Sequence, residues 1–258
     1  MERWAVVTGA SGGIGLEIAR ELAARGHALV LSARSEDRLR QLAAELQQAH
    51  GVRTHVVALD LGQPGGADAL AARIAEAGIE PAILVNNAGI GRFGEFARTE
   101  LAATQETLEL NVTALTRITA LLLPALLRQA PAHILNVAST AAFQPGPGMA
   151  VYFATKAYVL SLGEALDAEL APHGVRVTTL CPGPTHSGFQ ARAQGERSAL
   201  FRGGMASAAA VARHGVRAMT RGRRVTVHGL FNRLLAFGVR LAPRALATAM
   251  AAWKLRRI

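Results

Sequence analysis

Short apolar stretches alternate with longer amphipathic stretches along most of this chain. The apolar stretches have the length of buried β-strands, and the stretches between them repeat apolar residues at helical spacing. Strands that are each followed by a helix form a parallel sheet, so the sequence predicts a doubly wound α/β fold with helices on both faces. We expect the strands at residues 3–8, 28–32, 54–59, 83–86, 134–138, 175–180 and 224–228.

The longer stretches predict the helices that cover this sheet. No repeat, low-complexity tract or linker divides the 258 residues, so they are expected to form one domain, residues 1–258. Pro124 is expected to interrupt the long fourth helix, because proline lacks the amide hydrogen that a helix interior needs. We expect the helices at residues 14–25, 35–50, 67–77, 101–129 and 150–170.

A glycine-rich turn follows the first predicted strand and opens directly into a helix. It occupies residues 8–15 and has the glycine spacing Gly-x-x-x-Gly-x-Gly. Glycines allow the backbone to turn tightly and approach a ligand, and the free amides of a helix N-terminus bind a pyrophosphate. The turn therefore predicts dinucleotide binding, and a merely tight loop is the alternative. The expected contacts are Gly9, Ser11, Gly13, Ile14 and Gly15.

Tyr152 and Lys156 lie four positions apart in the predicted helix at 150–170, and thus on one helix face. An ammonium beside a phenol favours the phenolate, so Tyr152 can exchange its proton near neutral pH. Ser139, at the end of the preceding predicted strand, carries a hydroxyl that can steady the oxygen receiving this proton. Tyrosine–lysine pairs also occur by chance in many helices, so this pair needs support from other motifs.

Several motifs together resemble the short-chain dehydrogenase/reductase family. They stand in the family's order and spacing over about residues 3–190. The resemblance implies a Rossmann-type, seven-stranded parallel sheet that binds NAD or NADP. It also implies a metal-free oxidoreductase that interconverts a ketone and a secondary alcohol by hydride transfer. The matching motifs are residues 8–15, residues 86–89 (Asn-Asn-Ala-Gly), Asn111, Ser139, Tyr152-x-x-x-Lys156 and Pro182-Gly183.

The resemblance assigns a role to each of four catalytic residues. Tyr152 matches the acid/base, and Lys156 matches the residue that lowers the pKa of the tyrosine and binds the nicotinamide ribose. Ser139 matches the hydroxyl that holds the substrate oxygen. Asn111 matches the asparagine that anchors a water between Lys156 and solvent. Alone, Ser139 or Asn111 could equally be a capping residue or a satisfied buried amide.

The same resemblance, with the end of the second strand, indicates the cofactor. Arg34 stands where an NAD-binding protein would carry a carboxylate, so we expect NADP(H), with Arg34 on the 2′-phosphate. A surface arginine is the alternative. Asp60 resembles the adenine contact, and Asn87 the cofactor contact of the 86–89 motif. Pro182 and Thr185 resemble the segment that touches the nicotinamide carboxamide, although valine is common where Thr185 stands.

Basic residues are concentrated in the last quarter of the chain. The net charge is +10, and residues 192–258 hold 14 of the 28 Lys and Arg but a single acid, Glu196. This excess favours an anionic membrane surface, an acidic partner or a phosphate-bearing substrate, unless it is only a solvated arginine-rich surface. No aromatic platform accompanies the charges, so nucleic acid is not expected as a partner.

The end of the chain departs from many members of the family. Residues 188–223 are expected to form the variable flap over the substrate, and residues 229–258 an amphipathic helical extension broken at Pro243. The extension has two interpretations: a helix pair packed on the domain or a second subunit, or an anchor lying peripherally on a membrane. Its apolar arc comprises Leu230, Phe231, Leu234, Leu235, Phe237 and Leu241.

Taken together, the sequence predicts an NADP(H)-dependent reductase of a moderately hydrophobic ketone, with a 3-oxoacyl thioester as the specific candidate. A dinucleotide-binding regulatory or scaffold protein without turnover is the alternative. The early first strand and the single Cys181 favour a cytoplasmic protein. The predicted helices at 101–129 and 150–170 resemble the family's subunit contacts, so a homodimer or homotetramer is expected.

Overall fold

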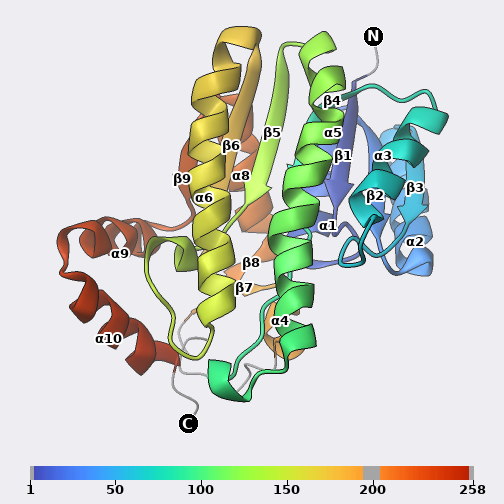
Figure 1. The fold of residues 1–258 in the computed structure, drawn as a ribbon. Helices are drawn as coiled ribbons and strands as arrows, with labels where there is room; N and C mark the ends of the chain where they lie inside the picture. The colour runs from blue at the N-terminus through green and yellow to red at the C-terminus, as the bar shows by residue number, and fades with distance from the viewer. Residues whose placement is uncertain (1–2, 194–203, 256–258) are drawn as a thin grey trace.

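The computed structural model describes residues 3–193 and 204–255 (Figure 1). Its centre is a parallel sheet of seven strands in the order β3-β2-β1-β4-β5-β6-β9. The predicted doubly wound α/β fold is thereby confirmed. The strands are β1 (Trp4–Thr8), β2 (Ala28–Ala33), β3 (Thr54–Ala58), β4 (Pro81–Asn86), β5 (Ala132–Val137), β6 (Val175–Cys181) and β9 (Val225–Val227), and a separate parallel pair joins β7 (Thr185–His186) to β8 (Ala206–Ser207).

Helices cover both faces of the sheet, which explains its nearly continuous apolar strands. Val6 and Val7 of β1 are both fully buried, but they belong to the cores on opposite faces. In Figure 1, α5 and α6 lie in front of the sheet, and α1 and α8 lie behind it. One core contains α1 (Gly13–Ala23), α2 (Glu36–His50) and α8 (Ala208–Thr220), and the other contains α3 (Gly66–Glu76), α5 (Leu115–Arg128) and the end of α6 (Ala150–Leu170).

The position of α8 corrects the predicted extent of the flap. Val211, Val216 and Met219 of α8 are fully buried in the core that also contains α1, so residues 208–220 are a core helix. A Cβ on Gly215 would lie 2.7 Å from a methyl carbon of Leu180, which shows how closely α8 approaches β6. Only the part of residues 188–223 before α8 is left to cover a ligand. It includes α7 (Phe189–Arg192), and residues 194–203 lie outside the described residues.

The predicted helix at residues 101–129 consists of three segments. These are α4 (Leu101–Leu108), the π-helical η2 (Glu109–Ala114) and α5. The expected interruption at Pro124 was wrong, because α5 continues through this residue. Pro124 is exposed, as is Ala120, whose carbonyl loses its helical donor and is open to water. The irregular turn instead surrounds Asn111.

By length and composition alone, Leu101–Arg128 could also cross a membrane. In the structure, however, Ile118, Leu122 and Leu126 are buried against the sheet. The stretch therefore serves as a core helix of the α/β fold.

The last two helices form an arm that extends from the β9 side of the sheet (Figure 1). We call residues 230–255 the C-terminal arm; it consists of α9 (Leu230–Leu241) and α10 (Arg244–Leu255), with Pro243 between them. Three 3₁₀ turns complete the described elements: η1 (Phe96–Arg98), η3 (Thr140–Phe143) and η4 (Ala171–His173).

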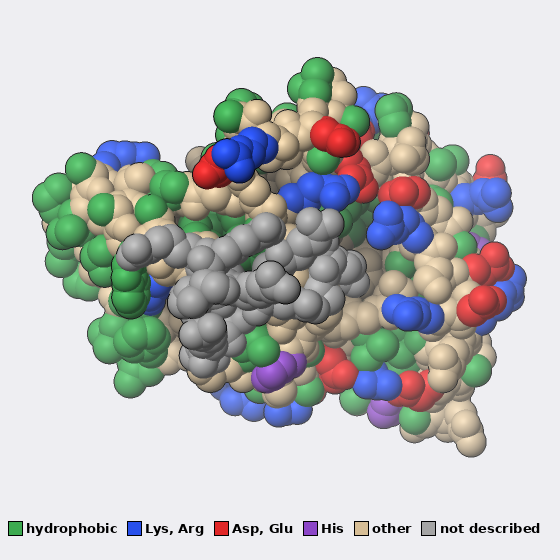
Figure 2. Space-filling model, turned by 90° about the horizontal axis from the view of Figure 1, so that it is seen from below, with side chains coloured by type: hydrophobic (Ala, Val, Ile, Leu, Met, Phe, Trp, Pro, Cys, Tyr) green, Lys and Arg blue, Asp and Glu red, His purple; other side chains and the backbone are tan. Residues whose placement is uncertain are grey.

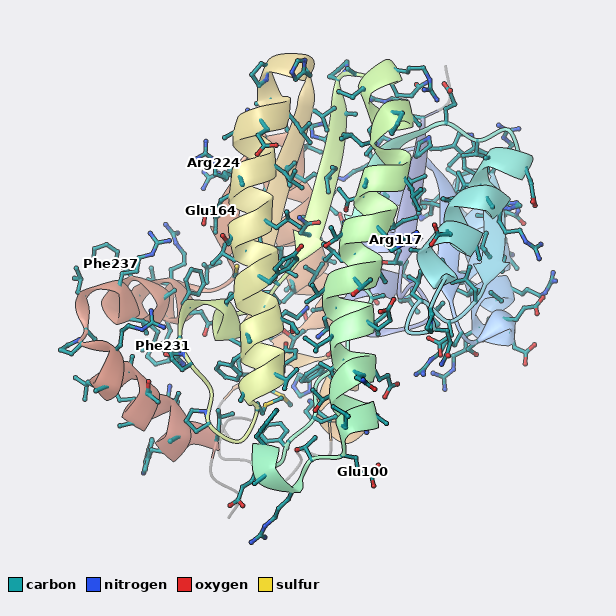
Figure 3. All side chains as sticks on the ribbon, viewed as in Figure 1. Glu100, Arg117, Glu164, Arg224, Phe231 and Phe237 are labelled. Atoms are coloured by element: carbon teal, nitrogen blue, oxygen red, sulfur yellow. The ribbon has the colours of Figure 1, made fainter. Side chains whose placement is uncertain are left out.

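Asp167 joins the last strands of the sheet to α6. Its carboxylate is 1% exposed and accepts hydrogen bonds from Arg176 Nε (2.9 Å), the Val177 amide (3.0 Å) and Arg224 Nε (3.2 Å). Arg224 lies beside α6 in Figure 3. Burial raises the pKa of Asp167, but these hydrogen bonds lower it more, so that the pKa lies below its ordinary value. The carboxylate thus stabilises the fold above that ordinary pKa and loses its contribution as the pH falls.

Asp167→Asn should lower the free energy of unfolding by about 2–3 kcal/mol at neutral pH, because it leaves two guanidinium groups without their buried anion. Denaturant titration measures the loss, and the variant should lose less additional stability than the wild type on acidification. Asp68→Asn, at an exposed pair with Arg117 (2.5 Å), is the matched control and should lower stability far less, because water screens an exposed ion pair. Equal losses in the two variants would contradict this account.

Candidate active site

A cavity of about 420 Å³ opens at the carboxyl edge of the sheet. Open parallel sheets bind ligands where the connections from two neighbouring strands run to opposite sides of the sheet, here from β1 to β2 and from β4 to β5. Loops that follow β1 to β6 all contribute to the cavity wall. Of the predicted site residues, the wall contains Gly9, Ser11, Gly13, Ile14, Arg34, Asp60, Asn87, Ser139, Tyr152, Lys156, Pro182 and Thr185.

Gly15 and Asn111 do not line this cavity. The contact of Gly15 with a cofactor stays a prediction, and packing gives an independent reason for the glycine. A Cβ on Gly15 would lie 2.3 Å from Nδ2 of Asn87 and 2.4 Å from the carbonyl oxygen of Gly9. The residue lets α1 approach the turn that precedes it.

The glycine turn is held by hydrogen bonds from the β4 end. Asn87 Nδ2 donates to the carbonyl oxygens of Thr8 (2.9 Å) and Gly9 (3.2 Å). Thr8 Oγ1 in turn accepts the amides of Asn87 (3.0 Å) and Ala88 (3.1 Å). Asn87 therefore both lines the cavity and fixes the turn, which its predicted role as a cofactor contact did not include.

The N-terminus of α1 faces the cavity through Gly12, Gly13 and Ile14. Gly12 at the N-cap supplies no side-chain acceptor for the first amides of the helix. Gly13 has φ +59°, and a Cβ on it would lie 2.8 Å from the carbonyl oxygen of Ser187. The free backbone amides at the N-terminus of a helix, where no bulky side chain blocks access, form a binding site for an anion.

Two arginines lie at the β2 end of the cavity. Arg34 is exposed and lies 3.8 Å from Asp60 Oδ2, whose other oxygen accepts the Gly62 amide (2.9 Å). Arg38, in the first turn of α2, also lines the cavity, as does Ser35. Arg38 is not among the residues predicted from the sequence. Its signal was its position four residues after Arg34, at a helix start next to a strand end.

The opposite wall holds Tyr152, Ser139 and Lys156. Tyr152 shares a side-chain hydrogen bond with Ser139, and Ser139 Oγ accepts the Ala141 amide (3.1 Å). Lys156 is 6% exposed, and its Nζ donates to the carbonyl oxygen of Val137 (2.9 Å). The same ammonium lies 5.8 Å from the centre of the Tyr152 ring. The structure thus brings the predicted pair and serine into one cluster.

The pKa values of this pair differ from the expected ones. Burial raises the pKa of Tyr152 to about 12, and the hydrogen bond with Ser139 offsets only part of this increase. Burial also lowers the pKa of Lys156 to about 8. The expectation that Lys156 lowers the pKa of Tyr152 is therefore wrong for the protein alone, because loss of water dominates at both groups.

Asn111 lies behind the cavity wall, in the π-helical turn η2. It is 1% exposed; its Nδ2 donates to the carbonyl oxygen of Ile90 (2.8 Å) and to Thr155 (3.0 Å), and its Oδ1 accepts the Ile90 amide (2.9 Å). A Cβ on Gly89 would lie 3.2 Å from Asn111 Oδ1 and 3.4 Å from Lys156 Nζ. Asn111 thus fixes the loop after β4 beside Lys156, and its role in anchoring a water stays a prediction.

The loop after β6 closes a further side of the cavity. The carbonyl oxygen of Pro182 accepts the Thr140 amide (2.9 Å), and Thr185 Oγ1 donates to the carbonyl oxygen of Gly183 (2.9 Å). Both predicted residues line the cavity. Burial raises the pKa of the Cys181 thiol to about 12, so this cysteine packs as an unreactive core residue.

Beyond Tyr152 the cavity becomes apolar. Met149, Phe153 and Phe189 line it, and the Phe189 ring centre lies 5.2 Å from that of Tyr152. The cluster that these side chains form also includes Leu255, the last described residue of α10. This apolar wall could not be predicted from the sequence, because its members come from segments that only the fold brings together.

Comparison with known proteins places this geometry in a family. The model of the short chain dehydrogenase family matches residues 3–198. A very-long-chain 3-oxoacyl-CoA reductase of Phaeosphaeria nodorum is 36% identical over 178 residues, covering 67% of this chain and 52% of the relative. The chain thus spans about half the length of that relative.

Two solved structures resemble the protein over most of both chains. A short-chain dehydrogenase from Sphingobium yanoikuyae in complex with NADPH has a TM-score of 0.82 at 33% identity, covering 93% of this chain and 94% of that one. A bulky-bulky ketone specific alcohol dehydrogenase from Comamonas testosteroni has a TM-score of 0.78 at 30% identity, covering 93% and 92%. The chain therefore belongs to the short chain dehydrogenase family, whose members are oxidoreductases of alcohol and ketone groups.

Lys156→Met should change how stability depends on pH. The unfolded wild type keeps a proton on this lysine up to its ordinary pKa of 10.5, whereas the folded protein releases it near 8. The wild-type free energy of unfolding therefore gains a contribution that rises with pH between these values. Denaturant titrations of both proteins at several pH values measure this effect. Between about pH 7 and about pH 10, the free energy of unfolding of the wild type should rise by about 2 kcal/mol relative to that of the variant. A constant difference would show that Lys156 is not desolvated.

Proposed function

We propose that the protein is an NADP(H)-dependent reductase of apolar ketones. One observation carries this proposal: a single cavity holds Tyr152, Ser139 and Lys156 on one wall and a helix N-terminus with two arginines at the other end. One cavity therefore combines a site for an anionic dinucleotide with a proton donor for the ketone bound beside it.

The residues of the cavity fit NADP(H). The cradle at Gly9 and Gly13 has no space for side chains, and α1 directs its free amides at this cradle. Arg34 and Arg38 supply guanidinium groups for a ribose phosphate, because guanidinium forms paired hydrogen bonds with phosphate. The complex of the Sphingobium yanoikuyae relative with NADPH supports this choice.

The protonation of the cluster favours reduction. When bound, NADPH would supply the hydride for the carbonyl carbon. Ser139 donates a hydrogen bond to the carbonyl oxygen, and Tyr152, whose pKa of about 12 keeps it protonated at neutral pH, gives its proton to that oxygen. The hydroxyl of Ser139 and the ammonium of Lys156 then stabilise the phenolate that remains. The pair needs its cation only when negative charge develops.

The apolar wall indicates the substrate class. Met149, Phe153 and Phe189 offer contacts to hydrocarbon and no charged group, so a ketone with long or bulky apolar substituents is favoured. A 3-oxoacyl thioester is our specific candidate, supported by the relatives named as 3-oxoacyl-CoA reductases. A panel of ketones with NADPH tests the class directly.

We also propose a cytoplasmic homodimer or homotetramer with contacts through α4, α5 and α6. Leu101, Leu108 and Leu121, which belong to α4 and α5, are exposed apolar side chains and support such a contact.

Tyr152→Phe should reduce turnover by about 10²–10⁴-fold, because it removes the only proposed proton donor. Its dissociation constant for NADPH should change by less than about threefold, since the ring and its packing are kept. Steady-state kinetics and cofactor titration measure the two effects. Tyr158→Phe, on the same helix with its hydroxyl 2.9 Å from Thr116, is the matched control and should keep wild-type activity. Turnover by the Tyr152 variant at the wild-type rate would refute the assigned role.

Arg34→Ala and Arg38→Ala should each weaken NADPH binding by about 10-fold or more and leave NADH binding nearly unchanged. A charged hydrogen bond to phosphate is worth about 1.5–3 kcal/mol, and NADH carries no 2′-phosphate. Fluorescence titration with both cofactors measures the ratio. Arg40→Ala, which breaks an exposed pair with Glu36 on the same helix, should alter neither. If the affinities for NADPH and NADH fall equally, the arginines do not bind the 2′-phosphate.

A further inference from the structure

The C-terminal arm exposes large apolar side chains along both of its helices. On α9 they recur at helical spacing, and on α10 they recur at i, i+4 and i+7. In Figure 2, hydrophobic side chains gather over the lobe at the left, and Figure 3 labels Phe231 and Phe237 on α9. The exposed side chains are Leu230 (71%), Phe231 (68%), Leu234 (62%), Phe237 (62%), Leu241 (74%), Leu246 (52%), Met250 (51%) and Trp253 (62%).

The C-terminal arm buries small residues against the domain and exposes large apolar residues, which is the opposite of a helix that covers a hydrophobic core. Its buried residues are Ala236, Ala247, Ala251 and Leu255, three of which are alanines. A helix that folds onto its own domain buries its largest apolar residues, because buried area drives the packing. Here most of the large apolar residues face outward, so we expect them to pack against an apolar surface other than the domain itself.

The charge of this part of the chain selects the surface. Residues 204–255 contain nine Lys and Arg and no Asp or Glu. Arg233 and Arg244 are exposed on the arm itself. A second copy of the arm would bring like charges together, whereas a layer of anionic headgroups over hydrocarbon matches both the basic and the apolar side chains.

We propose that the C-terminal arm docks on the surface of an anionic lipid bilayer. Its Leu, Phe, Met and Trp side chains enter the boundary between headgroups and acyl chains, and Arg233 and Arg244 contact lipid phosphates. Tryptophan suits this depth because its ring is apolar and its indole N–H is polar, which is the reason for its enrichment at membrane interfaces. The arm lies on the membrane and does not cross it.

The arm also contacts the walls of the active site. Leu255 belongs to the apolar cluster of Met149 and Phe153, and a Cβ on Gly183 would lie 2.4 Å from Nδ2 of Asn232. The docked surface therefore lies next to the apolar end of the cavity. This part of the inference rests on the proposed function: ketones dissolved in the membrane are the substrates that this arrangement delivers. Docking itself does not depend on turnover.

Co-sedimentation of the full chain with vesicles tests docking. The wild type should bind vesicles of phosphatidylglycerol and phosphatidylcholine, and bind pure phosphatidylcholine about 10-fold or more weakly. The variant Leu234→Ser/Phe237→Ser/Trp253→Ser should lose about 10-fold or more of the binding to anionic vesicles. The control Phe96→Ser changes an exposed apolar residue outside the arm and outside the proposed subunit contact (67% exposed) and should bind like the wild type. Equal loss in both variants, or no binding by the wild type, would overturn the proposal.

Charge reversal separates lipid from protein partners. Arg233→Glu/Arg244→Glu should weaken binding to anionic vesicles by about 10-fold or more, whereas Arg73→Glu/Arg98→Glu, at exposed sites outside the arm, should not. Sedimentation velocity without lipid should give the same oligomer for all four variants. A change of oligomer confined to the arm variants would identify a second copy as the partner and refute docking on lipid.

Trp253 gives a direct readout that does not require loss of function. The chain has one other tryptophan, Trp4, so Trp4→Phe leaves Trp253 as the only indole. Anionic vesicles should shift its emission to shorter wavelength, and brominated acyl chains should quench it. An unchanged spectrum at saturating vesicle concentration would contradict insertion. Because none of these measurements uses turnover, they remain decisive if the proposed reductase activity fails.

Discussion

The constraint on which the structure depends is a parallel sheet buried on both faces. Val6 and Val7 enter different cores, so β1 is apolar on both faces, and most polar side chains that line the cavity come from the loops that follow the strands. The connection that follows β1 runs to one side of the sheet and the connection that follows β4 runs to the other, and this switch opens the carboxyl edge between the two strands. Thr8, the last residue of β1, and Asn87, the residue after β4, tie the glycine turn to the opening by hydrogen bonds. The fold thus places the phosphate cradle and the proton donor in one cavity.

Much of this arrangement was predictable because it depends on local pattern. The strand–helix alternation predicted the sheet, and twelve of the predicted residues line the cavity. Errors arose where three-dimensional contacts decide. Pro124 is tolerated because its side of α5 is exposed, and residues 208–220 form a core helix and no flap because α8 packs in the core that contains α1. Arg38 was missed because only the fold brings α2 to the cavity, and Leu255 because its partners lie about 100 residues earlier.

Burial explains the electrostatics of the Tyr152–Lys156 pair better than attraction does. Both groups lose water, so each moves toward its neutral form, with pKa values of about 12 and about 8. A neutral phenol is a proton donor, and the lysine bound to the Val137 carbonyl lies close enough to respond once negative charge forms. The loss of water around Lys156 makes its charged form less stable, and it also strengthens the attraction between the ammonium and the Tyr152 phenolate. The C-terminal arm adds apolar surface beside this site through Leu255.

The central claim is that this cavity brings a nicotinamide and a ketone together for direct hydride transfer, with the proton supplied separately by the protein. The most direct measurement mixes the protein with NADPH carrying deuterium on the transferring face of the nicotinamide C4 and with an apolar ketone, and analyses the alcohol by mass spectrometry. The account predicts an alcohol with one deuterium on its carbinol carbon, whereas reaction of unlabelled NADPH in deuterated water should give none there. Carbon-bound deuterium that comes from the solvent, or the absence of any alcohol across a panel of apolar ketones despite NADPH binding, would contradict it.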